Sequence, residues 1–361
     1  MTLRSVYVNA SEVMCAPIGT ETSNQVITNE SEVVAFKSFR DEIDSSKFGD
    51  ILAYFDQLLL PLFAKLSLTA EELRTTSLFL GSTSLDISAV DIGNSGELWL
   101  STTNKINRAL VERYGLNDLE FTFSTACTAS ANACLYATRL IAQGKIDNAL
   151  VIGCEFYNPL TVEGFKSLDL ISQTGLAAFA KGRSGLVLGE GLAALYLSAN
   201  ASEQCQFKLL GGASACDTYS LTMTQEDGSH IAQVIIDGLN HAGISPCDID
   251  VVKVHGTATL GNDEAECNAL TKVFNQHKPP LIAFKPFTGH TLGACGVIEI
   301  ALYVQCQLQQ NYAVANYADN GKDLMWPFYL KPDFTQLNTV LLNYFGFGGN
   351  NAALVMQRYK A

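Results

Sequence analysis

The sequence predicts an α/β fold, because apolar runs of strand length alternate with longer stretches of helical periodicity. The runs are SLFLG at 77–81, ALVIG at 149–153, VVKVHG at 251–256 and LIAFK at 281–285. Runs this short and this apolar are typical of strands buried on both faces. No linker, low-complexity tract or charge block divides the chain.

A faint internal repeat predicts two similar halves. Residues 121–153 and 281–315 each have the pattern strand, turn, small-residue helix and strand. Each half then ends in a glycine pair followed by Ala-Ala-Leu, in GEGLAAL at 189–195 and GGNNAAL at 348–354. An N-terminal half over residues 1–200 and a C-terminal half over 201–361 account for this pattern. Chance similarity between strands rich in Gly and Ala is the alternative explanation.

The composition indicates a large buried core and excludes several kinds of partner. Of 361 residues, 48% are hydrophobic and 16% charged. A net charge of -13 disfavours nucleic acid and anionic membranes. The ten cysteines form no CxxC pair, so neither a zinc site nor a disulfide framework is indicated. The chain begins like a strand, and its apolar run at 58–66 is too short to span a bilayer, so we expect a cytoplasmic protein.

The segment STACTAS at 124–130 places Cys127 between a predicted strand and a helix rich in Ala. Unpaired N–H groups at a helix start carry partial positive charge, which stabilises a thiolate. The small neighbouring residues would let a substrate approach the sulfur. A buried structural cysteine is the alternative interpretation, and for a lone cysteine it is the more common one.

Two further segments each place a histidine at a strand-to-helix turn. His255 opens HGTATLGNDEAE at 255–266, and His290 lies within KPFTGHTLGACGVIE at 285–299. Asp263 and Glu266 lie at helical spacing, so a metal site with His255 is an alternative, although no known ligand spacing matches. The glycines after His290 permit close approach of backbone or of another helix. They lack the order of a phosphate loop, which excludes nucleotide binding on that pattern.

A cysteine and two histidines at three such turns together indicate thiolate catalysis with charge stabilisation in the same site. A fourth segment, NYFGFGGNNAAL at 343–354, has glycines suited to a backbone that bends beside a ligand. The structural alternative for this segment is a buried, glycine-rich strand corner.

At this point the chain resembles the β-ketoacyl–acyl carrier protein synthases (ketosynthases) of the thiolase superfamily. The resemblance rests on five ordered stretches: TAC at 125–127, RSGLVLGEGLAAL at 183–195, HGTATLGNDEAE, KPFTGHTLGACGVIE and NYFGFGGNNA at 343–352. It implies a thiolase fold, in which two βαβαβαββ halves form a five-layer αβαβα sandwich. It also implies a dimer, and substrates carried on the phosphopantetheine arm of an acyl carrier protein with no resident cofactor or metal.

The resemblance further implies the roles of individual residues. Cys127 would take the acyl chain, and His255 and His290 would promote decarboxylation of a malonyl extender and stabilise the enolate. Backbone N–H groups of Cys127 and Phe347 would form an oxyanion hole, and the Phe347 side chain would gate the nucleophile. The remaining matches are Lys285 and Glu299 as supporting charges and Thr257 and Thr259 as contacts of the pantetheine arm.

The chain departs from the family pattern in several places. It is short, with losses before Cys127 and between Tyr157 and Phe179. Three family positions are changed, where Ala180 and Ser184 replace Asp and Asn350 replaces Thr. These trimmed surroundings favour a heterodimer in which a second ketosynthase-like chain completes the pocket.

Three functions therefore remain open. An active, elongating ketosynthase of fatty acid, polyketide or polyene biosynthesis is favoured, because Cys127, His255 and His290 are all present. A non-elongating partner subunit, similar to chain-length factors, is the alternative. A thiolase or another acyltransferase on the same fold is more distant, since the C-terminal glycine segment lacks the second cysteine that a thiolase carries there.

Overall fold

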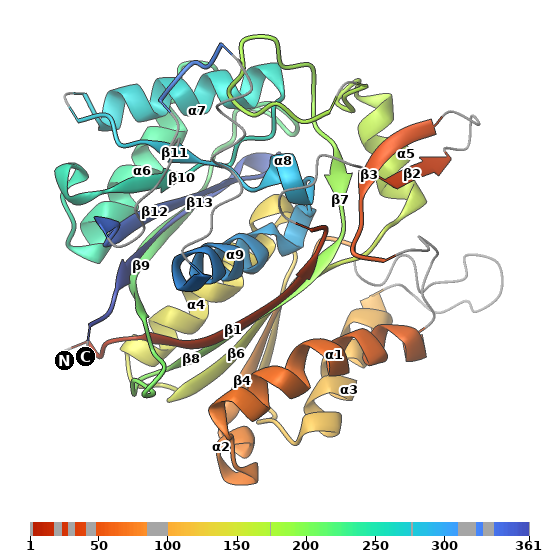
Figure 1. The fold of residues 1–361 in the computed structure, drawn as a ribbon, viewed down its shortest axis with the longest axis vertical. Helices are drawn as coiled ribbons and strands as arrows, with labels where there is room; N and C mark the ends of the chain where they lie inside the picture. The colour runs from red at the N-terminus through yellow and green to blue at the C-terminus, as the bar shows by residue number, and fades with distance from the viewer. Residues whose placement is uncertain are drawn as a thin grey trace.

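The chain forms a layered α/β structure in which two inner helices lie between two halves of a sheet (Figure 1). The computed structural model describes residues 3–17, 24–27, 33–40, 48–84, 100–173, 175–275, 277–309, 323–327 and 336–360. The inner helices are α4 (Ala129–Ala142) and α9 (Cys295–Gln309). Other helices cover the outer face of each half.

The first half of the described chain has the order βαβαβαββ. Its elements are β1 (Tyr7–Cys15), α1 (Phe48–Leu66), β4 (Thr76–Gly81), α3 (Leu100–Tyr114), β5 (Glu120–Phe123), α4, β6 (Asn148–Glu155) and β8 (Gly191–Ser198). The shorter elements α2 (Ala70–Arg74) and α5 (Pro159–Ser167) lie between these, and β2 (Asn24–Ile27), β3 (Val33–Lys37) and β7 (Leu188–Gly189) form a small separate sheet.

The second half has the same order. Its elements are β9 (Phe207–Cys216), α6 (Ser229–Ala242), β10 (Val251–Lys253), α7 (Leu260–Val273), β11 (Leu281–Ile282), α9, β12 (Thr339–Phe345) and β13 (Asn350–Arg358), with the short α8 (Lys285–Thr288) before α9.

The strand order shows the internal symmetry. It is β11-β10-β12-β13-β9-β1-β8-β6-β4-β5, and the two halves join where Tyr7 and Val8 of β1 pair with Lys208 and Phe207 of β9. In each half one strand, β4 or β10, pairs in parallel with both of its neighbours. The last two strands of each half, β6 with β8 and β12 with β13, are antiparallel. The predicted α/β fold of layered sheets and helices is confirmed.

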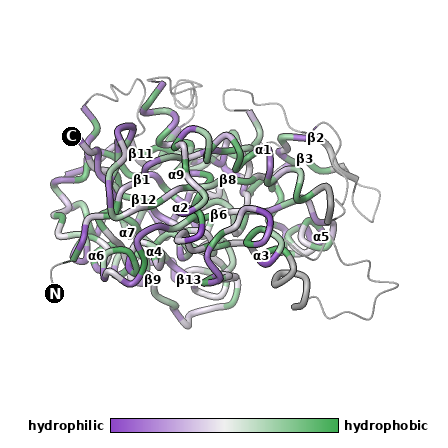
Figure 2. Tube along the Cα trace, turned by 90° about the horizontal axis from the view of Figure 1, so that it is seen from below, coloured by the Kyte–Doolittle hydropathy of each residue, from purple (hydrophilic) through white to green (hydrophobic). Residues whose placement is uncertain are grey.

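Apolar patterning explains where each helix lies. On α1 the buried positions Ile51, Phe55, Leu58 and Leu62 recur at helical spacing, and the helix packs against β1 and β8. Outer helices such as α6 carry hydrophilic and hydrophobic residues in turn (Figure 2). The inner helices are buried on nearly every side, because sheet or helix covers each face.

One sequence expectation needs correction. The run at 281–285 is a strand only over Leu281–Ile282, because Pro286 has no N–H for a ladder and favours the first turn of α8 instead. The strand expected at 310–315 lies outside the described residues, and β12 takes the equivalent place in the sheet. Among the helices described, none combines the length and apolar character needed to cross a bilayer.

Candidate active site

Cys127 lies at the sharp turn between β5 and α4. It is the middle residue of a short 3₁₀ helix, Ala126–Thr128, which leads directly into α4. Ala126 has a φ of 49°, which residues with a side chain rarely adopt, so the turn holds the cysteine in an unusual conformation. Only 5% of Cys127 is exposed.

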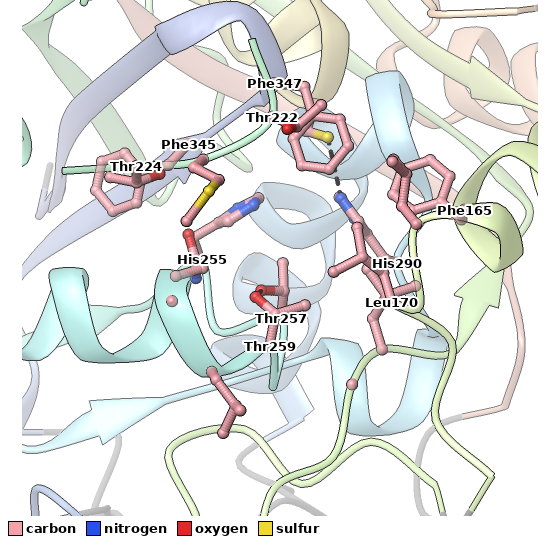
Figure 3. A pocket seen from close by; sticks show the side chains of 18 of the residues that line it. Phe165, Leu170, Thr222, Thr224, His255, Thr257, Thr259, His290, Phe345 and Phe347 are labelled. Carbon is pink, nitrogen blue, oxygen red and sulfur yellow. Dashed lines mark hydrogen bonds between the residues drawn. The ribbon is translucent and has the colours of Figure 1, made fainter. Parts of the chain in front are cut away.

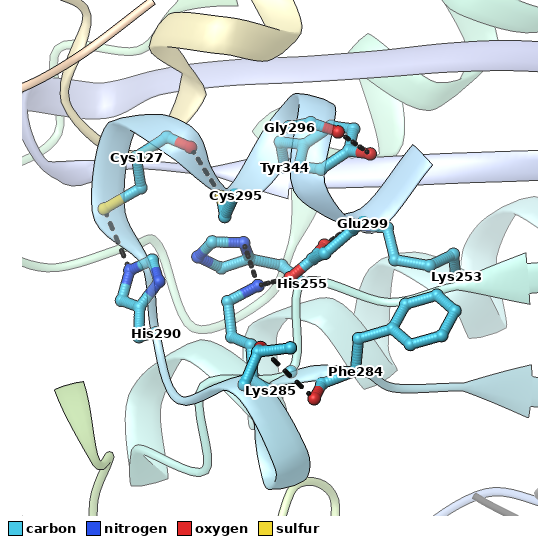
Figure 4. Close-up of polar contacts among 12 residues, drawn as sticks. Cys127, Lys253, His255, Phe284, Lys285, His290, Cys295, Gly296, Glu299 and Tyr344 are labelled. Carbon is cyan, nitrogen blue, oxygen red and sulfur yellow. Dashed lines mark hydrogen bonds and ion pairs between the residues drawn. The ribbon is translucent and has the colours of Figure 1, made fainter. Parts of the chain in front are cut away.

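His290 lies beside the sulfur of Cys127. It follows Gly289, whose φ of 68° ends α8, and precedes the 3₁₀ helix Leu292–Ala294 that leads into α9. His290 Nε2 is 3.0 Å from Cys127 Sγ (Figure 4). The backbone N–H of His290 donates to Val187 O at 2.7 Å, which fixes the turn, while its Nδ1 is buried without a hydrogen-bond partner.

His255 supplies the second imidazole from the end of β10. Its ring lies edge-to-face with that of His290, with 5.3 Å between centroids. The backbone N–H groups of His255 and Gly256 donate to Glu266 Oε1 and Oε2 at 2.9 and 3.0 Å. Glu266 of α7 therefore holds the loop that carries His255.

Burial keeps the reactive groups uncharged. It lowers the pKa of both histidines well below the usual 6.5, and the Lys285 ammonium lowers them further. Burial also raises the pKa of the Cys127 thiol to about 11, although Lys285 and the backbone N–H groups of Phe347 and Cys127 oppose this rise. The expected stabilisation of a thiolate by the helix start is thus outweighed by desolvation in the free protein.

A buried cluster of charges lies behind the two histidines. Lys285 Nζ donates to Glu299 Oε1 at 2.7 Å and lies 3.4 Å from His255 Nδ1 (Figure 4). Burial acts to lower the pKa of Lys285, but the Glu299 carboxylate reverses this and raises it overall. The imidazole of His255 is therefore oriented by a cation that stays protonated at neutral pH.

The glycine segment after β12 closes over the cysteine. Phe347 begins the 3₁₀ helix Phe347–Gly349, and its backbone N–H points at the Cys127 sulfur. A Cβ atom on Gly346 would lie 3.0 Å from Cys127 N, so a glycine is needed for this approach. The Phe347 ring stacks on Phe165 of α5 at 5.4 Å between centroids.

A pocket of about 430 Å³ contains the cysteine and both histidines (Figure 3). Thr257 and Thr259 line it, with their hydroxyls 3.0 Å apart. Its other labelled walls come from Phe165, Leu170, Thr222, Thr224, Phe345 and Phe347.

The structure brings together all eight residues predicted for the site, namely Cys127, Thr257, Thr259, His255, Lys285, His290, Glu299 and Phe347. Asp263 and Glu266, the alternative metal ligands, instead bind backbone N–H groups in the structure. Asp263 accepts the N–H groups of Phe179 and Ala258 at 2.7 and 3.2 Å, much as Glu266 accepts those beside His255. Both carboxylates are thus anchors of backbone.

Two buried charged residues were missed by the sequence analysis. Lys253 of β10 bonds the second oxygen of Glu299, and Glu155 at the end of β6 accepts the N–H groups of Thr83 and Gly293 at 2.8 and 3.1 Å. Each stands in or beside an apolar strand run, where a charged residue is rare unless it is paired. A charged residue in or beside an apolar strand run was therefore the sequence signal that could have revealed both residues.

The departures from the family pattern have local partners. Ser184 Oγ lies 2.8 Å from Ser172 Oγ, and Asn350 Nδ2 donates to Phe347 O at 3.1 Å. Ala180 is buried. Asn350 therefore helps to hold the glycine segment over Cys127.

Two protein-family models match the two halves of the chain. Residues 68–202 match the β-ketoacyl synthase N-terminal domain, and residues 207–317 match the β-ketoacyl synthase C-terminal domain. A ketosynthase solved in complex with its chain length factor, from Xenorhabdus doucetiae, superposes with a TM-score of 0.80 at 23% identity over 99% of this chain and 98% of its own. A β-ketoacyl synthase from Burkholderia phymatum gives 0.78 at 20% identity over 99% and 100%.

The chain thus has a thiolase-like fold with a cysteine and two histidines at its centre. A putative polyketide β-ketoacyl synthase 1 from Streptomyces cyaneus is 30% identical over 307 residues, covering 76% of this chain and 72% of that protein. The chain belongs to the β-ketoacyl synthase family. It spans 63% of the putative mitochondrial 3-oxoacyl-[acyl-carrier-protein] synthase of Schizosaccharomyces pombe, which is 30% identical over 69% of this chain.

Proposed function

We propose that the chain is a β-ketoacyl–acyl carrier protein synthase that performs decarboxylative Claisen condensation. The observation that carries this proposal is the placement of Cys127 Sγ 3.0 Å from His290 Nε2, with His255 beside it, in one pocket. Neutral imidazoles suit this reaction, because each can donate an Nε2–H to a developing oxyanion.

The first half-reaction loads the acyl chain. Cys127 Sγ attacks the thioester carbonyl of an acyl carrier protein, and its proton passes to His290 Nε2. The tetrahedral oxyanion is held by the N–H groups of Cys127 and Phe347. Its collapse breaks the bond to the pantetheine sulfur, which takes the proton from His290, and leaves an acyl thioester on Cys127.

The second half-reaction extends the acyl chain that Cys127 carries. A malonyl carrier thioester enters along Thr257 and Thr259. Its carbonyl oxygen accepts hydrogen bonds from the Nε2–H of His255 and from the Nε2–H of His290, which reaches this tautomer by losing its Nδ1 proton to water and gaining one from water at Nε2. Loss of carbon dioxide leaves an enolate on that carbonyl. Its carbon attacks the Cys127 thioester, and the Cys127 thiolate leaves and takes the Nε2 proton of His290, which regains a proton from water at Nδ1. The product is two carbons longer and remains on the carrier.

Intact-mass analysis after incubation with an acyl carrier protein tests the loading step. Wild type is expected to gain one acyl mass and Cys127→Ala none. Cys134→Ala is the matched control, since Cys134 is a buried thiol two turns along α4 outside the pocket. His255→Ala is expected to load and yet fail to release carbon dioxide from malonyl carrier. A wild type that gains no acyl mass, alone or with a partner chain, would refute the elongating function.

We also propose that the chain works as a dimer, either with itself or with a second ketosynthase-like chain. Among the described strands β5 is an edge, paired only with β4, and Phe121, Phe123 and the 46% exposed Tyr136 lie along that edge. A non-elongating role beside such a partner is the second candidate. Native mass spectrometry distinguishes a homodimer from a heterodimer when the chain is purified with and without a second ketosynthase-like chain.

The two remaining expectations have structural support of their own. The division into residues 1–200 and 201–361 is supported by the repeated element order, with β8 ending at Ser198 and β9 beginning at Phe207. A cytoplasmic, reducing location is supported by the ten cysteines, all of which are unpaired. Limited proteolysis and thiol titration of freshly isolated protein test these proposals.

A further inference from the structure

The charge cluster behind His255 contains one more cation than its carboxylate requires. Lys253 of β10 is fully buried, and its Nζ donates to Glu299 Oε2 at 2.5 Å and to Asn343 O at 2.6 Å. It also lies 3.5 Å from the centroid of the Tyr344 ring. Glu299 already pairs with Lys285 through its other oxygen.

A second buried ammonium at this place is costly unless it has a use. Burying a charge requires compensation, and one carboxylate balances only one of two lysines. Two residues before His255 on a short strand, an apolar side chain would fill the same space without that cost. The cost is therefore incurred beside the residues that develop negative charge in the proposed reaction.

The surroundings of Lys253 contain further titratable groups on every side. They are Glu299 and Cys295 of α9, Lys285 of α8, Tyr344 of β12, and His255 and His290 at the pocket. Burial raises the pKa of Tyr344 and Cys295 and lowers that of both histidines, so these four stay neutral. Glu299 and the two lysines remain as the charged members, with a net charge of one positive unit when both lysines are protonated.

We infer that Lys253 is a positioning residue that steers Lys285 toward His255 and adds a second positive charge to the cluster behind the two histidines. By occupying Glu299 Oε2, it confines Lys285 to Oε1 and to the 3.4 Å approach to His255 Nδ1. This role rests on the proposed condensation only for the enolate. Its effect on the Cys127 thiol, which acts through the position of Lys285, is independent of any substrate.

Alkylation of Cys127 by iodoacetamide measures that independent effect. At pH 7 the rate in Lys253→Met is expected to fall about tenfold, because Lys285 is then free to turn toward Glu299 Oε2 and its positive charge, which favours the thiolate, moves away from Cys127. Lys253→Arg is expected to restore the rate to within about threefold. Gln307→Leu, a buried change on α9 that leaves the charges intact, is the matched control and should leave the rate unchanged. Equal rates in wild type and Lys253→Met, or an equal fall in Gln307→Leu, would overturn the inference.

A wild-type pH profile tests the same inference without a variant. Burial, which outweighs the pull of Glu299, lowers the pKa of Lys253 to about 8, whereas that of Lys285 is raised. Lys253 is therefore cationic below pH 8 and loses its proton above it. Malonyl-carrier decarboxylation should decline between pH 7 and 9.5 in wild type, and this decline should be absent from the slower Lys253→Met. A flat wild-type profile refutes the role of Lys253. Absence of any decarboxylation, with the alkylation difference intact, refutes the proposed function alone.

Discussion

Replacing Gly296 by alanine should separate the two inner helices and damage the site at a distance. Gly296 lies in the first turn of α9, where that helix crosses the start of α4. A Cβ atom there would lie 2.2 Å from Ala131 N, 2.7 Å from Ala131 Cα and 2.8 Å from Ser130 C. All three are backbone atoms, so no rotation of a side chain can relieve the contact.

The required movement sets the size of the effect. Ordinary contact begins at 3.4 Å, so the helices must move apart by about 1.2 Å at this crossing. Overpacking of this kind costs about 1–3 kcal/mol, and we expect the upper end because backbone must shift. The same movement separates Cys127 from His290, which lie just before the two helices. A misplacement of about 1 Å costs roughly 100-fold in rate.

Two measurements check this prediction. Denaturant unfolding should show a loss of about 3 kcal/mol, and intact-mass analysis should show acyl loading slowed about 100-fold. Gly164→Ala on α5 is the matched control, because a Cβ atom there meets nothing within 4 Å. It should change stability by no more than about 1 kcal/mol. Unfolding free energy and loading rate of Gly296→Ala equal to those of the control would refute the packing argument.

Three further predictions concern the pocket itself. The rate of Cys127 alkylation should increase several-fold per pH unit from pH 7 to 10. Burial raises the pKa of Cys127 to about 11, so the fraction of thiolate increases with pH over this range. A rate that reaches a plateau below pH 9 would contradict this prediction. Glu266→Gln should lower the rate of malonyl decarboxylation at least tenfold, because the amide would place an N–H group against the backbone N–H donors of His255 and Gly256. An unchanged rate at equal stability would show that the loop holds its conformation without the carboxylate. Phe165→Ala should free the stacked Phe347 ring and speed loading of long acyl chains more than short ones, and equal changes for both lengths would exclude a gate.

Local pattern was enough to predict several elements and the turns that hold the cysteine and the two histidines. Apolar runs defined β4 and β6, and the turns holding Cys127 and His255 each follow a described strand as expected, whereas the turn holding His290 follows α8. Lys285 was expected to end a strand and instead begins α8, because Pro286 favours the first turn of a helix.

Partnership over long sequence distances could not be predicted in the same way. The burial of Lys253 makes sense only with Glu299, 46 residues later, and with the carbonyl of Asn343, 90 residues later. Glu155 likewise joins segments 72 residues before it and 138 residues after it. No periodicity in a single sequence encodes these distances, because they arise from the packing of elements within each half and, for Glu155 and Gly293, from the packing of one half on the other.

The duplicated architecture explains why a thiol and an imidazole meet at the centre. A 3₁₀ helix precedes each inner helix, and its first residue has a positive φ in both halves: 49° at Ala126 and 45° at Leu292. By this equivalence Cys127 occupies in the first half the place that Gly293 occupies in the second. A Cβ atom on Gly293 would lie 2.5 Å from Thr83 N, so the second turn has no room for a side chain, and His290 reaches the sulfur from three residues earlier. One strained turn, used twice, thus presents a thiol from one half and an imidazole from the other, and the helix crossing at Gly296 sets the distance between them.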